Sequence, residues 1–259
     1  MRIRATVAVV SGALALTALA VPAAQADDSV GDTKISNVVV NGGKAVVVDA
    51  TKAKKVTLTF TATDNSGIAW AQPILYRGAS IQKPETGALA DSSDGRAKCT
   101  KVDATKSTCE ATFTLKQWDN LINSVAGTWK VWIVAAAKDD DYMEKENAKS
   151  FSVQRASKLT VDASPEPVKK GKTITVTGKL SRANWETGKY AGYSAQSVKL
   201  QFRKKSSSTY TTVKTIKTNS TGNLKTTVKA SVDGYFRYSF AGTTTTPAVN
   251  AAGDFVDVK

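Results

Sequence analysis

Five oxygen-bearing side chains have the chemistry of a calcium site. Asp64 and Asn65 follow a stretch that alternates apolar residues with threonine, and Asp139, Asp140 and Asp141 follow a second, strongly apolar stretch. Calcium in proteins takes roughly six to eight oxygen ligands, from carboxylates, carbonyls and water. If both stretches are strands that end at the same side of one β-sandwich, the two loops meet there. The sequence then predicts calcium as a cofactor held by these five residues.

The acidic loop has a second interpretation, a solvated hairpin tip. Lys138 and Lys145 flank the carboxylates and partly neutralise them. The run from Asp139 onward also lacks the alternating ligands, the central glycine and the final glutamate of an EF-hand loop. Both interpretations stay open at the level of sequence.

The residue inventory argues against catalysis. The chain contains 0 histidines, which excludes Ser-His-Asp and Cys-His machinery and every histidine-ligated zinc site. Ser80 and Lys83 match a Ser-x-x-Lys pattern, but the Ser-Asp-Asn and Lys-Thr-Gly motifs that accompany it in penicillin-interacting enzymes are missing. A carboxylate pair of the glycoside hydrolase type remains the third and least favoured hypothesis, because no spacing selects a pair. We predict that the protein is not an enzyme.

One long loop of the second half is rich in aromatic residues. It runs from Ser181 to Tyr193 and contains Trp185, Tyr190 and Tyr193 among small and polar residues. Aromatic faces of this kind stack on sugar rings or contact a protein partner. The alternative function is therefore a carbohydrate-binding module whose ligand-binding residues are these three. The competing interpretation is that they cap the open end of a hydrophobic core.

Positive charge is concentrated in the second half of the chain. Residues 27–155 contain 17 Lys and Arg and 16 Asp and Glu, whereas residues 156–259 contain 17 and 6, a net charge of +11. Dispersed positive charge attracts polyanions without reading a base sequence. We expect an anionic cell-wall polymer, or an extracellular polysaccharide or protein, as the partner, and no specific nucleic acid. The alternative is a cationic face that only keeps the domain in solution.

The two cysteines, Cys99 and Cys109, predict one structural disulfide. The residues between them are polar and turn-forming, as in a hairpin connection. A redox pair would need the Cys-x-x-Cys spacing, which is absent.

The elements that must position these residues are β-strands. Apolar and polar residues alternate, as in strands with one face in a core, in four stretches: Val56–Thr63, Thr173–Thr177, Val198–Arg203 and Leu224–Lys229. Residues 129–137 are apolar at both parities and predict a central strand covered on both sides. Only residues 115–125 favour a helical turn or two.

The N-terminus predicts export. Arg2 and Arg4 precede an apolar run, and an Ala-Gln-Ala motif ends at Ala26, a pattern typical of a cleaved signal peptide. We expect the mature chain to begin at Asp27, to be extracellular and monomeric without a transmembrane segment, and to attach to a cell wall only non-covalently. The change in charge divides the mature chain into domains at residues 27–155 and 156–259.

Both halves resemble the immunoglobulin-like modules of exported bacterial proteins. The resemblance lies in residues 56–68 and 127–131 of the first half, and in residues 171–178 and 233–237 of the second. The whole also resembles small two-domain secreted proteins of high-GC Gram-positive bacteria, some of them labelled calcium-binding. This resemblance implies an all-β fold of two consecutive immunoglobulin-like antiparallel β-sandwich domains and a non-catalytic binding or structural role. The chain lacks the inter-sheet cysteine pair of antibody domains.

Overall fold

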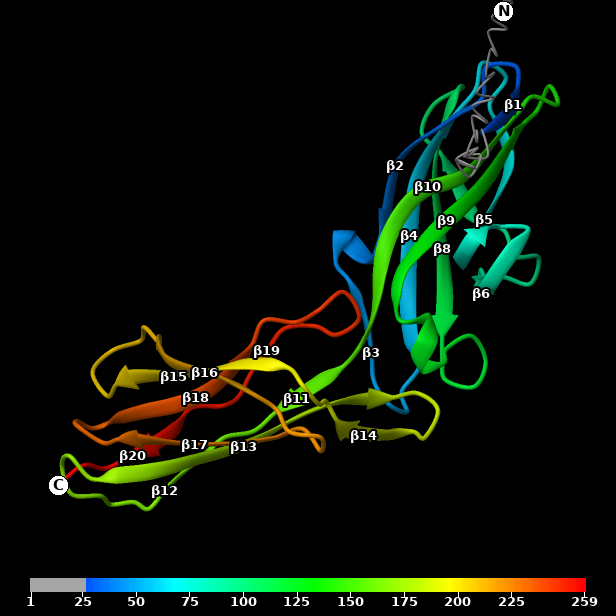
Figure 1. Ribbon diagram of the computed structural model, residues 1–259. Helices are drawn as coiled ribbons and strands as arrows, with labels where there is room; N and C mark the ends of the chain where they lie inside the picture. The colour runs from blue at the N-terminus through cyan, green and yellow to red at the C-terminus, as the bar shows by residue number, and fades with distance from the viewer. Residues whose placement is uncertain (1–26) are drawn as a thin grey trace, which may run out of the picture.

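The computed structural model describes residues 27–259, and β-strands make up most of this part of the chain (Figure 1). The predicted signal peptide, residues 1–26, lies outside the described residues. Within them, the helical elements are two 3-10 turns, η1 (Asn41–Gly43) and η2 (Asn123–Val125), and the second falls in the segment where the sequence predicts a helical turn. None of residues 27–259 belongs to a helix long and apolar enough to cross a membrane.

The first sandwich, residues 27–155, has the strand order of an immunoglobulin domain. Its first sheet is ordered β2 (Lys34–Val40), β4 (Lys54–Thr63), β8 (Lys106–Leu115) and β7 (Lys98–Lys101). Its second sheet is ordered β1 (Asp28–Val30), β10 (Tyr142–Arg155), β9 (Gly127–Ala137), β5 (Ile68–Ser80) and β6 (Lys83–Leu89), and β3 (Val46–Val48) pairs with β10 in parallel. This arrangement corresponds to the A-B-E-D and G-F-C sheets of immunoglobulin domains, and the all-β fold class that the sequence predicts is confirmed.

Alternation along the strands builds the core of this sandwich. In β4, Val56, Leu58 and Phe60 point inward and are almost completely buried, while the threonines between them face out. In β9, Trp129 and Ile133 supply the opposite wall. The outer face of β9 is mostly half-buried and exposed at Thr128, so the expectation that this strand is enclosed on both sides is wrong.

The predicted disulfide is present between β7 and β8. Cys99 and Cys109 are directly paired in register, and the sulfurs are bonded at 2.01 Å. Since β7 is an edge strand of its sheet, the covalent link joins it to its one neighbouring strand in that sheet, β8.

We expect the Cys99→Ala, Cys109→Ala double variant to lose about 2 to 3 kcal/mol of unfolding free energy. The physical reason is that the bond closes a short loop, which restricts the unfolded chain. Urea unfolding with and without a reductant measures the effect, because reduction of the wild type should reproduce most of the loss without changing a side chain. Equal stability of the oxidised, reduced and variant proteins would contradict the expectation.

The second sandwich, residues 156–259, is also built from two sheets. One sheet contains β12 (Asp162–Ser164), β13 (Thr173–Asn184) and β17 (Asn223–Lys229), and β11 (Ser157–Leu159) and β14 (Lys189–Gly192) pair with the distal half of β13. The other sheet contains β16 (Thr211–Lys217), β15 (Ser197–Lys204) and β18 (Gly234–Phe240), and both β19 (Val249–Asn250) and β20 (Asp254–Val256) pair with β18. Inward side chains of both sheets form a second core around Val176, Leu200 and Tyr238.

A hairpin of the second sandwich packs against the first sandwich at their junction. β13 is long enough to leave its own sandwich, and with β14 it reaches the lower end of the first one (Figure 1). Ala183 and Trp185 of this hairpin belong to the hydrophobic core of the first sandwich. The chain passes between the sandwiches where β10 ends at Arg155 and β11 begins at Ser157.

Candidate functional site

Three carboxylates meet at the end of the first sandwich that lies far from the junction. Asp32 lies in the turn between β1 and β2, Asp64 follows β4, and Asp141 precedes β10. One carboxylate oxygen from each lies within 4.8 Å of the others. Residues from three separate segments are thus brought to one point by the strand order of the sandwich.

Asp64 is the buried member of this cluster, with an exposed fraction of 3%. Its carboxylate accepts hydrogen bonds from the Thr33 hydroxyl (2.7 Å), the Ser66 hydroxyl (2.7 Å) and the Ser66 backbone N–H (2.7 Å). Burial by itself raises the pKa of Asp64, but these hydrogen bonds outweigh burial and hold the pKa below its ordinary value. Asp64 therefore stays ionised beside two other acids.

The loop that carries Asp141 is held against the loop after β4. The backbone N–H of Lys138 donates to the Gly67 carbonyl (3.0 Å) and to the Ser66 hydroxyl (3.2 Å). The Asp141 carboxylate accepts from the Asp32 backbone N–H at 3.0 Å. The carboxylate also occupies the space beside Gly31, where a β-carbon would lie 1.5 Å from its Oδ2 atom. The two loops therefore meet, as the strand pattern of the sequence predicts.

The membership of the cluster differs from the predicted set. Asn65, Asp139 and Asp140 are exposed, and the group that converges consists of Asp64 and Asp141 with Asp32 in place of the other three. The Asp139 carboxylate accepts a long hydrogen bond of 3.4 Å from the Asp141 backbone N–H. Sequence reasoning missed Asp32 because the short strands on either side of it have no clear alternation.

The predicted aromatic ligand site is part of the junction. Trp185 is 0% exposed, and its indole N–H points at the Val48 carbonyl of the first sandwich at 3.4 Å. Its backbone N–H donates to the Asn123 side chain at 3.0 Å. A ring buried on both faces cannot stack on a sugar, so the binding role predicted for Trp185 is corrected: the residue caps a core, and the core is that of the neighbouring domain.

The two tyrosines of the predicted ligand site have separate surroundings. The Tyr190 hydroxyl donates to Asp49 Oδ2 at 2.6 Å, and the Lys158 ammonium lies 3.8 Å from the centre of its ring. Tyr193 instead packs at the second core, edge-on to Phe240 at a centroid distance of 5.9 Å. The structure therefore does not bring Trp185, Tyr190 and Tyr193 together as one surface.

We expect Tyr190→Phe to lower the free energy of unfolding at neutral pH by about 1 kcal/mol, because it removes the hydrogen bond to Asp49. That hydrogen bond is the largest cause that holds the pKa of Asp49 below its ordinary value. A carboxyl with a lowered pKa in the folded state stabilises the fold above its unfolded pKa of about 3.9 and loses this contribution as the pH falls through the folded pKa. The difference between wild type and variant should be complete at pH 7 and should shrink below about pH 4.

Urea unfolding across this pH range measures the effect of Tyr190→Phe. In an Asp49→Asn background the same substitution should have little effect, since the charged acceptor is already missing. A difference that stays constant down to acidic pH would contradict the assignment.

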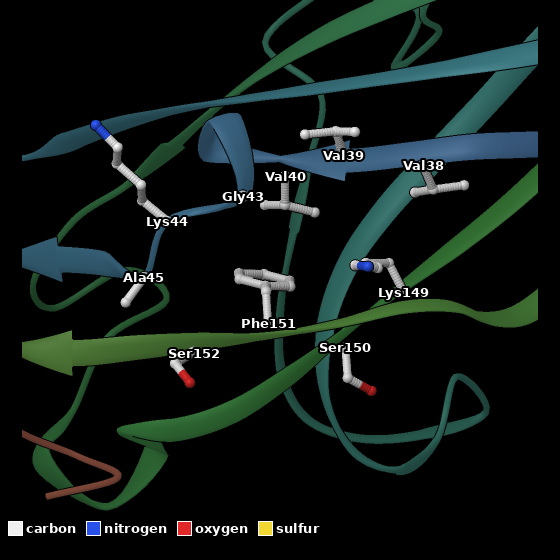
Figure 2. A pocket seen from close by; sticks show the side chains of 10 residues that line it. All are labelled: Val38, Val39, Val40, Gly43, Lys44, Ala45, Lys149, Ser150, Phe151 and Ser152. Carbon is white, nitrogen blue, oxygen red and sulfur yellow. The ribbon is translucent and has the colours of Figure 1, made fainter.

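An apolar groove opens on one side of the first sandwich between β2 and β10. Figure 2 shows that Val38, Val40 and Phe151 line it and that Lys44 and Lys149 stand at its rim. The groove lies where the chain passes from one sheet to the other, since β2 pairs with β4 and the following strand, β3, pairs with β10. Its volume is about 300 Å³. The half-buried Phe151 packs on the core residue Trp129 at its base.

The basic residues of the second sandwich lie on the outer faces of both sheets. Lys179, Lys225 and Lys229 are exposed on the sheet of β13 and β17, and Lys199 and Lys217 are exposed on the sheet of β15 and β16. The protein is therefore defined by two joined immunoglobulin-like sandwiches, an acidic cluster at the far end of the first, and a basic surface on the second.

Comparison with known proteins identifies no family. No family model matches the chain, and no curated protein does. Among solved structures, the chain is similar to the D00-D0 domain of intimin at 14% identity and a TM-score of 0.27, covering 86% of this chain and 99% of that one. It is similar to the adhesin InvE of Yersinia pseudotuberculosis at 14% identity and a TM-score of 0.28, with coverages of 85% and 58%. A DUF4785 family protein of Legionella pneumophila matches at 13% identity and a TM-score of 0.37, with coverages of 80% and 52%. At these values the similarity carries no information on function.

Proposed function

We propose that this protein is a secreted, non-catalytic binding protein that attaches through its basic second domain to an anionic polymer of the cell wall. The observation that supports the proposal is the segregation of charge, with a net +11 on residues 156–259. Positive charge at this density attracts polyanions over distances of about 10 Å in dilute salt. The absence of histidine from the sequence favours binding over catalysis.

The junction between the two sandwiches would orient the first domain when the second domain is attached. Because Trp185 of the second domain is buried in the core of the first, attachment of the second domain also fixes the orientation of the first. The acidic end of the first sandwich then points away from the attached domain (Figure 1).

Sedimentation of the mature protein with purified cell walls tests the proposed attachment. Binding should be strong in low salt, should fall as salt increases because ions screen the charges, and should be lost after the anionic polymer is extracted from the walls. Binding that is insensitive to salt and survives extraction would contradict the proposal and would favour recognition of an uncharged polysaccharide.

We propose a calcium site at the acidic cluster as a second candidate function. It is favoured by the convergence of Asp32, Asp64 and Asp141 within 4.8 Å. Calcium prefers such carboxylate oxygens, and backbone carbonyls and water can complete its coordination. Three carboxylates at this separation repel one another without a cation.

We expect calcium to raise the melting temperature of the wild type by about 5 °C or more at concentrations about a hundredfold above the dissociation constant. Asp141→Asn should abolish the shift, since it removes a charged ligand, and should leave the calcium-free protein at least as stable because repulsion is relieved. Calorimetry with calcium and with chelator measures both quantities.

Asp119→Asn is the matched control for this experiment. Asp119 is an exposed acid beside Lys116, at the opposite end of the same sandwich. This variant should retain the full calcium shift. A wild type with no shift at millimolar calcium, or a shift that Asp119→Asn removes as well, would reject the calcium site.

A further inference from the structure

One outer face of the second sandwich carries a continuous row of stacked cationic and aromatic side chains. They come from the sheet of β16, β15, β18 and β20 and from the loop before β16, and in spatial order they are Arg237, Tyr210, Arg203, Tyr235, Phe255 and Lys205. We call this row the stacked face. All of its members except the exposed Lys205 are half-buried.

Close contacts define the row. The Arg237 guanidinium lies 3.8 Å from the centre of the Tyr210 ring. The Arg203 guanidinium lies between two rings, 5.4 Å from the centre of Tyr210 and 3.8 Å from the centre of Tyr235. The Tyr235 and Phe255 rings follow at 5.1 Å. The row arises from strand register, because Arg203 pairs with Tyr235 and Tyr235 with Phe255 across neighbouring strands.

The two guanidinium groups are fixed in place but keep most of their hydrogen-bonding capacity. Arg203 donates to the Ser207 carbonyl, and Arg237 donates to the Gln201 side chain. A guanidinium has about five N–H donors in a planar fork that suits phosphate, sulfate and carboxylate groups. Stacking on aromatic rings covers the faces of this plane and leaves its edges available.

No carboxylate balances these two charges within residues 27–259. Neither Arg203 nor Arg237 has an acidic oxygen within 4.0 Å, and the ion pair nearest in sequence joins Lys205 to Asp233 at 3.8 Å. Two like charges held around one tyrosine ring repel each other. A bound anion would relieve this repulsion.

The rest of the same face offers hydroxyl and amide groups beside further positive charge. Gln201 lies opposite Thr212 and Arg237, and the exposed Lys199 lies opposite Thr215 and Ser239. A row of alternating charge and hydroxyl-bonding groups fits a polymer that carries both anionic groups and sugar hydroxyls. Inorganic polyanions carry anionic groups but no sugar hydroxyls.

We propose that the stacked face, together with the adjoining Lys199, is the binding surface for an acidic polysaccharide, with Arg203 and Arg237 holding its anionic groups. This inference rests on the proposed attachment to an anionic polymer and narrows it to one face and one class of ligand. The opposite sheet of the same domain, with Lys225 and Lys229, contributes only long-range attraction.

Binding of the mature protein to dextran sulfate, dextran and inorganic polyphosphate tests the inference. The wild type should bind dextran sulfate, should not bind dextran, and should bind polyphosphate at least several-fold more weakly per charge. The Arg203→Gln, Arg237→Gln variant should weaken dextran sulfate binding about tenfold or more, because it removes two sets of charge-assisted hydrogen bonds.

The Lys225→Gln, Lys229→Gln variant is the matched control. It removes the same charge from the opposite sheet and should weaken binding less than about threefold through the loss of long-range attraction alone. If both variants lose affinity equally, the assignment of binding to the stacked face is wrong, although the proposal of charge-driven attachment still holds. If polyphosphate binds as well as dextran sulfate, the choice of a polysaccharide is wrong. Thermal melts show whether each variant is folded. If the Arg203→Gln, Arg237→Gln variant is not folded, the Arg203→Lys, Arg237→Lys variant takes its place. A loss of affinity is again expected, because lysine lacks the planar fork of the guanidinium.

Failure of this inference and failure of the proposed attachment are distinguishable. Cell-wall sedimentation of the wild type tests attachment, whereas the two variants test the face. A wild type that sediments with walls but ignores dextran sulfate would overturn the inference alone.

Discussion

Trp185→Ala should lower the free energy of unfolding by about 3 to 5 kcal/mol, the range for removal of a large aromatic side chain from a packed core. Trp185 is among the largest side chains of the protein that are completely buried, with an exposed fraction of 0%. The substitution leaves a cavity and removes the donor to the Val48 carbonyl. Its neighbours across the junction, Asn123 and Val48, belong to strands and turns that cannot collapse freely into the space.

The location of Trp185 makes the expected effect larger than a change within one domain. The residue is supplied by the second sandwich, but it packs in the core of the first. We therefore expect the wild type to unfold with the two sandwiches coupled and the variant to unfold in two separate transitions, the first domain at lower temperature. Calorimetry measures the coupling, and urea unfolding measures the loss of free energy.

Trp118→Ala is the matched control because Trp118 also crosses the junction. Its indole N–H donates to the Glu186 carbonyl at 3.1 Å, but its exposed fraction is 69%. We expect a loss of about 1 kcal/mol, typical of one hydrogen bond at a surface, and retained coupling. A Trp185→Ala protein as stable as Trp118→Ala would show that the buried contact does not hold the sandwiches together.

The strands could be predicted from the sequence because their cause is local. The alternation of apolar residues and threonine in residues 56–63 indicates which side chains face a core. In the structure, the apolar side chains of β4 are the buried ones, as this alternation predicts. The disulfide was equally accessible, because the sequence contains a single pair of cysteines. Gly127 and Gly234 each begin an aromatic-rich strand, and both strands, β9 and β18, are inner strands of their sheets.

The role of Trp185 could not be predicted because it depends on contacts between distant segments. The sequence indicates that an aromatic residue in this loop either caps a core or binds a ligand, but not which core lies within reach. Its contacts are with Asn123 and Val48, 62 and 137 residues away. The pattern of residues 181–193 contains no information about these partners.

The acidic cluster could be predicted from the sequence only in part. That Asp64 and Asp141 meet follows from strand order, which the sequence predicts. That Asp32 joins them and Asp139 does not depends on the conformation of individual turns, in which Gly31 has a φ of 75° and Asp140 has a φ of 70°. Such turn conformations are set by tertiary contacts as much as by residue type.

Gly222→Ala should destabilise the protein by about 3 to 5 kcal/mol, the combined effect of a left-handed backbone and of overpacking. Gly222 has a φ of 82°, and a β-carbon there would lie 2.3 Å from the Leu180 carbonyl oxygen and 2.7 Å from the Tyr193 backbone nitrogen. These neighbours are backbone atoms and cannot rotate away. The Gly222 carbonyl also accepts a hydrogen bond from Leu180 N–H at 2.9 Å, in the middle of β13. A shift at this point would displace the hairpin that carries Trp185 to the first sandwich, so we expect part of the loss to appear as weaker coupling.

Gly171→Ala separates the two causes of this effect. Gly171 has nearly the same backbone conformation, with a φ of 81°, but no atom lies within 4 Å of the position that a β-carbon would take. Its substitution should therefore cost only the conformational part, about 1 to 2 kcal/mol, and should leave the coupling of the sandwiches unchanged. Urea unfolding of both variants measures the difference. Equal losses would mean that the close approach of β13, β14 and the turn at Gly222 relaxes without resistance, and the junction would then owe its rigidity to the buried tryptophan alone.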